Sequence, residues 1–186
     1  MTSLAALWLP IILSAVIVFV ASSIIHMLLP WHKNEFPRVP DENALMDAVR
    51  PLAIPPGEYM VPRAGDMEAL KSPEFVERAN RGPVFILRML PNGIRPMGPL
   101  LGQWFVYLLV VDILTALVAQ QALPTGAAGH RVFHVIALTS LLGYAMALWQ
   151  VSIWYGRPWR TTIMATIDGI IYAVITALLF VWLWPR

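Results

Sequence analysis

Leu4–Leu29, with the sequence LAALWLPIILSAVIVFVASSIIHMLL, contains no lysine, arginine, aspartate or glutamate. A helix needs about 20 apolar residues to cross a bilayer core about 30 Å thick, and this stretch is long enough. Three further stretches are similarly long and apolar, although the first and third of them each contain one aspartate: Leu100–Leu123, Val132–Trp154 and Ile163–Trp184. The sequence therefore predicts an all-α membrane protein, a bundle of four transmembrane helices. We interpret the first stretch as an uncleaved anchor, because no basic region precedes it and it is longer than the apolar part of a signal peptide.

The composition excludes several classes of protein. Of the 186 residues, 58% are hydrophobic and 13% are charged, and the formal net charge is +2. A soluble domain has about 25% charged residues, so an ordinary soluble fold is excluded. The charged residues do not form an acidic or basic tail, which argues against a nucleic-acid partner. The chain has no cysteine. Disulfides, thiolate metal sites and a cysteine nucleophile are therefore excluded as well.

Four spans divide the chain into three parts and place both termini on one side. Residues 1–30 form the first transmembrane helix, residues 31–99 form a loop of about 70 residues, and residues 100–186 hold the other three helices. Basic residues close to the span ends are concentrated on the loop's side: Lys33, Arg38, Arg88, Arg95, Arg157 and Arg160. By the positive-inside rule the 31–99 loop is cytoplasmic and the two termini are periplasmic.

The long loop carries most of the charge but has none in total. It holds 9 of the 13 basic residues and 9 of the 11 acidic ones. Asp41 and the Ser72-Pro73 pair are helix start signals, so we expect two short helices after them. Four prolines predict an extended Pro51–Pro62 segment. Val84–Leu90 is too short to span, so it is either an interfacial segment or a strand-like piece.

Ionisable side chains inside a membrane are costly, and they usually face other helices, a cavity or a partner. Asp112 lies near the middle of the second span, and Asp168 lies about 8 Å inside the loop-side end of the fourth. We predict a buried polar seam with these members: Asp112, Asp168, Tyr172, Thr176, Gln150 and His134. In one interpretation hydrogen bonds to these carboxyls hold the helices in register. In the other the carboxyls bind a proton or cation in a transport path.

A second candidate site is the cytoplasmic rim, where a lipid headgroup would meet polar side chains. Its candidates are His26, His32, Arg88, Arg95, Arg157 and Arg160. His130 and His134 are four residues apart and form a weak candidate for a metal site, without an obvious third ligand. His26 and His134 lie at opposite membrane faces, so one chain cannot clamp a haem between them. We therefore expect no cofactor, although we do expect bound lipid.

Three segments resemble parts of an uncharacterised family of small bacterial inner-membrane proteins: Leu29-Pro30-Trp31-His32-Lys33, residues 55–62 (PPGEYMVP) and residues 153–157 (IWYGR). The resemblance implies a bacterial inner membrane and no activity. No nucleotide-binding, hydrolase or metalloprotease motif is present. We predict a structural or accessory component of a homo-oligomer or larger membrane complex. The alternatives are a small proton-coupled transporter or channel that uses Asp112 and Asp168, and a lipid-headgroup enzyme or binder.

Overall fold

The computed structural model describes residues 2–186 and divides them into two compact units. The helical unit consists of the chain up to Phe36 and Pro96–Arg186, and the loop unit consists of Pro37–Arg95. The predicted boundary of the loop was Trp31, so the structure assigns residues 31–36 to the helical unit instead. These six residues include His32 and Glu35, which matter below.

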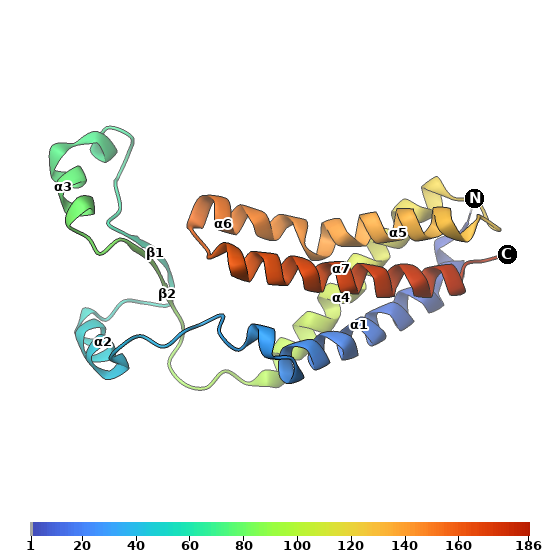
Figure 1. Cartoon of the computed structure of the whole chain (residues 1–186), viewed down its shortest axis with the longest axis horizontal. Coiled ribbons are helices and arrows are strands. Elements are labelled where there is room, and N and C mark those ends of the chain that lie inside the picture. The colour runs from blue at the N-terminus through green and yellow to red at the C-terminus, as the bar shows by residue number, and fades with distance from the viewer. Residues whose placement is uncertain (1) are drawn as a thin grey trace. The chain divides into compact units, whose positions relative to one another are not determined.

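Four helical segments are long and apolar enough to cross a membrane, in agreement with the sequence prediction (Figure 1). They are Leu4–Leu28, Met97–Ala122, Gly129–Tyr155 and Trp159–Trp182. The first joins a short 3-10 turn to α1 (Trp8–Leu28), and the second and fourth are α4 (Met97–Ala122) and α7 (Trp159–Trp182). Pro96 and Pro158 are the N-cap residues of α4 and α7, which start a few residues earlier than the predicted apolar stretches.

The third segment is not one continuous helix. It consists of α5 (Gly129–Tyr144), a 3-10 turn η5 (Met146–Leu148) and α6 (Trp149–Tyr155). The interruption occurs at Ala145, which has φ −133° and ψ −37°. Ala145 faces Gly169 of α7, where an added Cβ would lie 2.6 Å from the Ala145 Cβ. The backbones of α5 and α7 therefore approach closely at the point where the third segment is interrupted.

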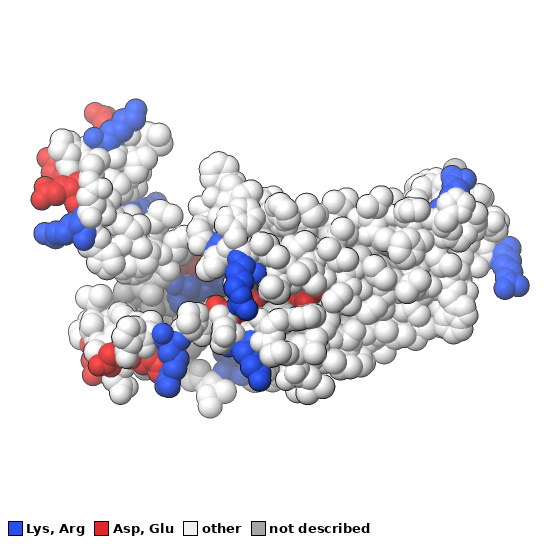
Figure 2. All heavy atoms as spheres, viewed as in Figure 1, with Lys and Arg blue, Asp and Glu red and all other residues white. Residues whose placement is uncertain are grey.

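The helical unit is held by contacts of α1 with α4 and α7, and of α5 with α4 and α7. One apolar cluster includes Leu7, Ala116, Ile136 and Phe180, all fully buried. The other cluster lies toward the end of the unit where α1 ends, and it includes Tyr172 and several partly buried aromatic residues. On the face shown in Figure 2, the middle of the helical unit shows no charged side chains, and the charged ones lie toward its two ends.

Both termini lie at the same end of the helical unit (Figure 1). The Thr2 hydroxyl donates to the Leu123 carbonyl at 3.3 Å, and the Gly126 N–H donates to the Pro185 carbonyl at 2.8 Å. The connection between α4 and α5 therefore contacts both ends of the chain. We call the opposite end, where α1 ends and α4 begins, the loop-side end.

The loop unit contains two helices and a two-stranded antiparallel sheet. The helices are α2 (Glu42–Val49) and α3 (Pro73–Arg81), and both predicted caps are present, because Asp41 accepts from the Ala44 N–H and Ser72 from the Phe75 N–H. The loop unit adds two strands to the predicted helical fold, and the second lies within Val84–Leu90, the stretch for which the sequence left a strand-like piece open. Strand β1 (Gly57–Val61), in the segment predicted to be extended, pairs antiparallel with β2 (Phe85–Met89). Short β-branched and aromatic runs pair readily once a long connection brings them together.

Candidate functional site

His32 and Asp168 meet at the loop-side end of the helical unit. The His32 Nε2 lies 2.9 Å from the Asp168 Oδ2, and the side chains are 8% and 4% exposed. Leu29 is extended because Pro30 follows it, and Pro30 starts the short 3-10 turn η2 (Pro30–His32). This change of direction after α1 brings the His32 ring over α7, which carries Asp168.

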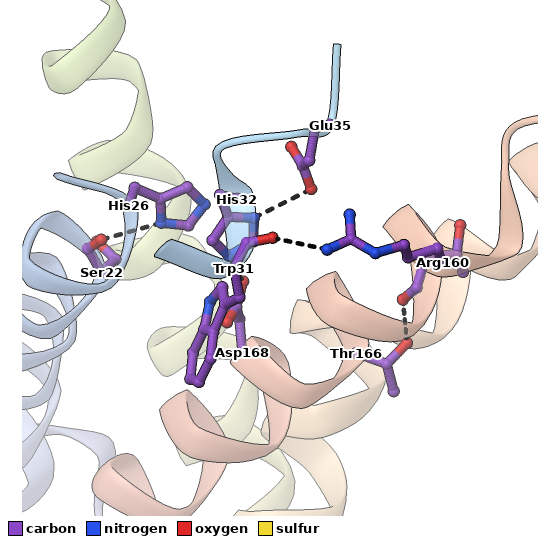
Figure 3. A network of polar contacts seen from close by, with 9 residues as sticks. Ser22, His26, Trp31, His32, Glu35, Arg160, Thr166 and Asp168 are labelled. Atoms are coloured by element: carbon purple, nitrogen blue, oxygen red, sulfur yellow. Dashed lines mark hydrogen bonds and ion pairs between the residues drawn. The ribbon is translucent and has the colours of Figure 1, made fainter. Parts of the chain in front are cut away.

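A second histidine stacks on the first. The rings of His26 and His32 have centroids 4.4 Å apart and lie 11° from parallel (Figure 3). The His26 Nδ1 lies 2.9 Å from the Ser22 carbonyl oxygen, and the His32 Nδ1 lies 3.0 Å from the Glu35 Oε1. Because carbonyl and carboxylate oxygens only accept, each Nδ1 must donate its N–H. In the neutral rings, both Nε2 atoms then carry lone pairs.

Several polar atoms at this end are buried without a good hydrogen bond. Among the residues from 2 to 186 they include the Asp168 Oδ1, the Tyr172 hydroxyl and the His32 Nε2. The His32 Nε2 lies 2.9 Å from the Asp168 Oδ2, which is an ion pair only when the ring is protonated, and no hydrogen bond joins the two atoms. Buried polar groups normally have partners, and a bound ion or water is one way in which such atoms are satisfied.

A pocket of about 570 Å³ opens beside this cluster. Its polar lining includes His26 and Asp168, and most of its other walls are aromatic or aliphatic. The four rings that line it are Trp104, Tyr107, Tyr144 and Tyr172. Trp104 and Tyr107 are stacked with centroids 5.3 Å apart. A carboxylate beside aromatic faces is an arrangement that attracts cations.

Asp112 occupies a different environment, deeper in the helical unit. It is fully buried, and its Oδ1 accepts a hydrogen bond of 3.1 Å from the Tyr144 hydroxyl. That hydroxyl also lies 3.5 Å from the Thr176 Oγ1. The contact joins α4, α5 and α7. The Asp112 Oδ2, like the Asp168 Oδ1, is buried without a hydrogen-bond partner, but Asp112 does not line the pocket. These contacts favour a role in holding the helices together.

Comparison with protein-family models, curated proteins and solved structures returns no match to this chain. The site is therefore interpreted from its own geometry.

The predicted polar seam is only partly assembled. Asp112, Asp168, Tyr172 and Thr176 are buried, as the seam requires. His134 and Gln150 are exposed, so their assignment to the seam was wrong. The buried face of α5 repeats every four residues from Val132 to Tyr144, which places His134 on the other side. Gln150 follows the break at Ala145, where the helix periodicity changes.

The predicted rim is divided between the two units. His26, His32, Arg157 and Arg160 belong to the helical unit, where Arg160 donates to the Trp31 carbonyl at 3.5 Å. Arg88 and Arg95 belong to the loop unit, so their assignment to a shared rim is not supported. Arg88 forms an ion pair with Glu58, the residue opposite it in the two-stranded sheet.

The side chains that could hold a metal ion lie elsewhere than the weak candidate pair. The weak candidates His130 and His134 are exposed near the termini and gain no third ligand. Within residues 2–186, the group of three that could hold an ion is His26, His32 and Asp168.

Sequence reasoning missed several members of the site, among them Glu35, Trp104 and Tyr144. Tyr144 lies four residues after Ser140 on the buried face of α5, and that spacing could have identified it. Glu35 lies three residues after His32, and this spacing suits an ion pair within one turn. Trp104 lies in α4, and its N–H donates to the Ser22 hydroxyl at 2.9 Å.

Proposed function

We propose that this protein is a multi-pass inner-membrane protein that binds a cation in the loop-side pocket, with Asp168 as the counter-charge. The observation that carries the proposal is the Asp168 Oδ1, which is buried, has no hydrogen-bond partner and belongs to a residue that lines the pocket. A carboxylate in such a place costs free energy unless an opposite charge compensates it. His26 and the aromatic walls add lone-pair and π-electron density.

The geometry separates the two membrane acids that the sequence left equivalent. Asp168 is at the pocket, whereas Asp112 is enclosed by Tyr144, Thr176 and neighbouring apolar residues. Towards the termini, the helical unit contains a buried apolar cluster that includes Ile136, Ala177 and Phe180. This arrangement supports binding from the loop side more than an open channel. The alternative role of both acids in proton-coupled transport stays a prediction.

The excess of basic residues at the loop-side end favours a cytoplasmic pocket and periplasmic termini. The accessory role in a homo-oligomer or larger complex also stays a prediction. Native mass spectrometry in mild detergent tests it, and a monomer without any partner would contradict it.

Thermal unfolding of the full chain in detergent tests cation binding. We would add zinc, manganese, magnesium or choline chloride at constant ionic strength, and choline represents the ammonium of a lipid headgroup. A ligand at 100 times its Kd stabilises the folded state by about 2.7 kcal/mol. We expect at least one of these cations to raise the midpoint.

The variants Asp168→Asn and Asp112→Asn form a matched pair for this experiment. Each replaces one buried carboxylate by its amide, and only the first changes the pocket. Asp168→Asn should lose the cation-dependent rise, and Asp112→Asn should keep it. If no cation shifts the wild type, or if both variants keep the shift, the proposal is wrong.

A further inference from the structure

The polar end of the pocket contains a set of side chains that suits a transition metal. His26 comes from the end of α1, His32 from η2 and Asp168 from α7. One ligand atom from each of the three lies within 4.8 Å of the others. Two imidazoles and one carboxylate are the donors of many three-ligand zinc sites. Figure 3 shows the three side chains converging from separate segments.

The hydrogen bonds around the two histidines determine which nitrogen of each ring is free for a metal. The Ser22 carbonyl accepts from the His26 Nδ1, and the Glu35 carboxylate accepts from the His32 Nδ1. A metal-bound histidine usually donates its other ring N–H to a carbonyl or carboxylate, which fixes the tautomer and raises ligand basicity. Both Nε2 atoms are therefore left for a metal.

Two further observations point to a missing ligand at the same place. The His32 Nε2 and the Asp168 Oδ1 are buried and have no hydrogen-bond partner. These atoms belong to two of the three candidate ligands, so one ion would satisfy both. A simple His32–Asp168 ion pair leaves the Asp168 Oδ1 without a partner.

We infer that His26, His32 and Asp168 bind one first-row divalent transition ion, of which Zn²⁺ is the natural probe. The inference rests on the proposed cation site and names its ligand class. Nitrogen donors favour such ions over Mg²⁺ and Ca²⁺, which prefer oxygen. Because His26 and Asp168 line the pocket, an open coordination position would face it, as in zinc sites that bind a water or substrate.

Coordination requires the histidine stack to open. The rings are nearly parallel with centroids 4.4 Å apart, so their lone pairs do not yet converge on one point. His26 is exposed at the end of α1 and has room to turn about its side-chain bonds. The competing explanation is that the stacked rings and the ion pair only anchor residues 30–36 to α7.

Zinc binding by the purified full chain decides between these explanations. The affinity tag is removed, the protein is stripped with a chelator, incubated with Zn²⁺ and desalted, and bound zinc is measured by mass spectrometry. We expect roughly one zinc per chain, as for a three-ligand site. The variants His26→Gln, His32→Gln and Asp168→Asn should each lose affinity by at least about tenfold, because each removes a ligand. His130→Gln and His134→Gln are matched controls at the other end and should bind as the wild type does.

A second measurement covers variants that fail to fold. Co²⁺ added to the stripped wild type should produce the visible absorption of a site with nitrogen ligands, and Zn²⁺ should displace it. Absence of both zinc retention and the cobalt spectrum would overturn the inference, and so would normal zinc binding by the three ligand variants. If magnesium or choline still stabilises the wild type through Asp168, only the metal assignment fails and the proposed cation site stands.

Discussion

The Nε2 of His32 lies 2.9 Å from the Oδ2 of Asp168, and this contact ties the segment after α1 to α7. The two residues belong to parts of the chain that the sequence assigned to a loop and to a transmembrane helix. Their contact places the buried Asp168 carboxylate beside His32 and the stacked His26 at the pocket. It also gives residues 30–36 a defined place in the helical unit.

Glu35 should influence the affinity of the site without being a ligand. Its carboxylate accepts from the His32 Nδ1 at 3.0 Å, so Glu35→Gln removes the charge that orients and polarises the ring. Loss of such a partner typically costs 10–100-fold in metal affinity. We expect a fall of about tenfold in zinc affinity, measured by competition with a chelating dye.

Glu42→Gln is the matched control for that experiment, because Glu42 pairs with Arg38 in the loop unit and is half exposed. Its zinc affinity should equal that of the wild type. Equal affinity of the Glu35→Gln protein would show that Glu35 does not support a metal ligand.

Tyr144→Phe should destabilise the helical unit. The change removes the hydroxyl that donates to Asp112 and leaves a fully buried carboxyl without that partner. An unsatisfied buried group costs about 1–3 kcal/mol. The thermal midpoint in detergent should fall, whereas that of Tyr155→Phe should not, because Tyr155 is 62% exposed. Equal midpoints for the two variants would refute the structural role of the Asp112 contact.

The close approach of α5 and α7 predicts a specific rescue. Gly169→Ala places a Cβ 2.6 Å from the Ala145 Cβ, and overpacking of this kind costs about 1–3 kcal/mol. Adding Ala145→Gly removes the opposing methyl group, so the double variant should recover much of the lost stability. Gly102→Ala is a control, because nothing lies within 4 Å of its added Cβ. Additive losses in the double variant would contradict the contact.

The absence of native cysteine makes the orientation easy to test. Single cysteines at Lys33 or Glu68 should be shielded from a membrane-impermeant thiol reagent added to intact spheroplasts. A cysteine at His130 should react, because it lies near the termini, which we predict to be periplasmic and therefore open to the reagent. The reverse pattern would place the 31–99 loop in the periplasm.

The four apolar helices could be predicted because span length and hydropathy are local properties of the chain. The inward positions of Asp112, Asp168, Tyr172 and Thr176 followed from helical periodicity. The α5 break could not be predicted, since it coincides with a contact between Ala145 and Gly169 of another helix. The contact between His32 and Asp168 could not be predicted either, because it depends on how the chain turns at Pro30. The two-stranded sheet depends on pairing between segments that are distant in the sequence.

X-ray absorption spectroscopy of the zinc-loaded protein at the zinc edge tests directly whether His26, His32 and Asp168 bind the metal. We expect nitrogen and oxygen neighbours at about 2.0–2.2 Å, with the outer-shell scattering of two imidazole rings. His32→Gln should lose one imidazole contribution. A spectrum with oxygen neighbours alone, or one that the His26→Gln and His32→Gln variants leave unchanged, would contradict the assignment of this cluster as the metal site.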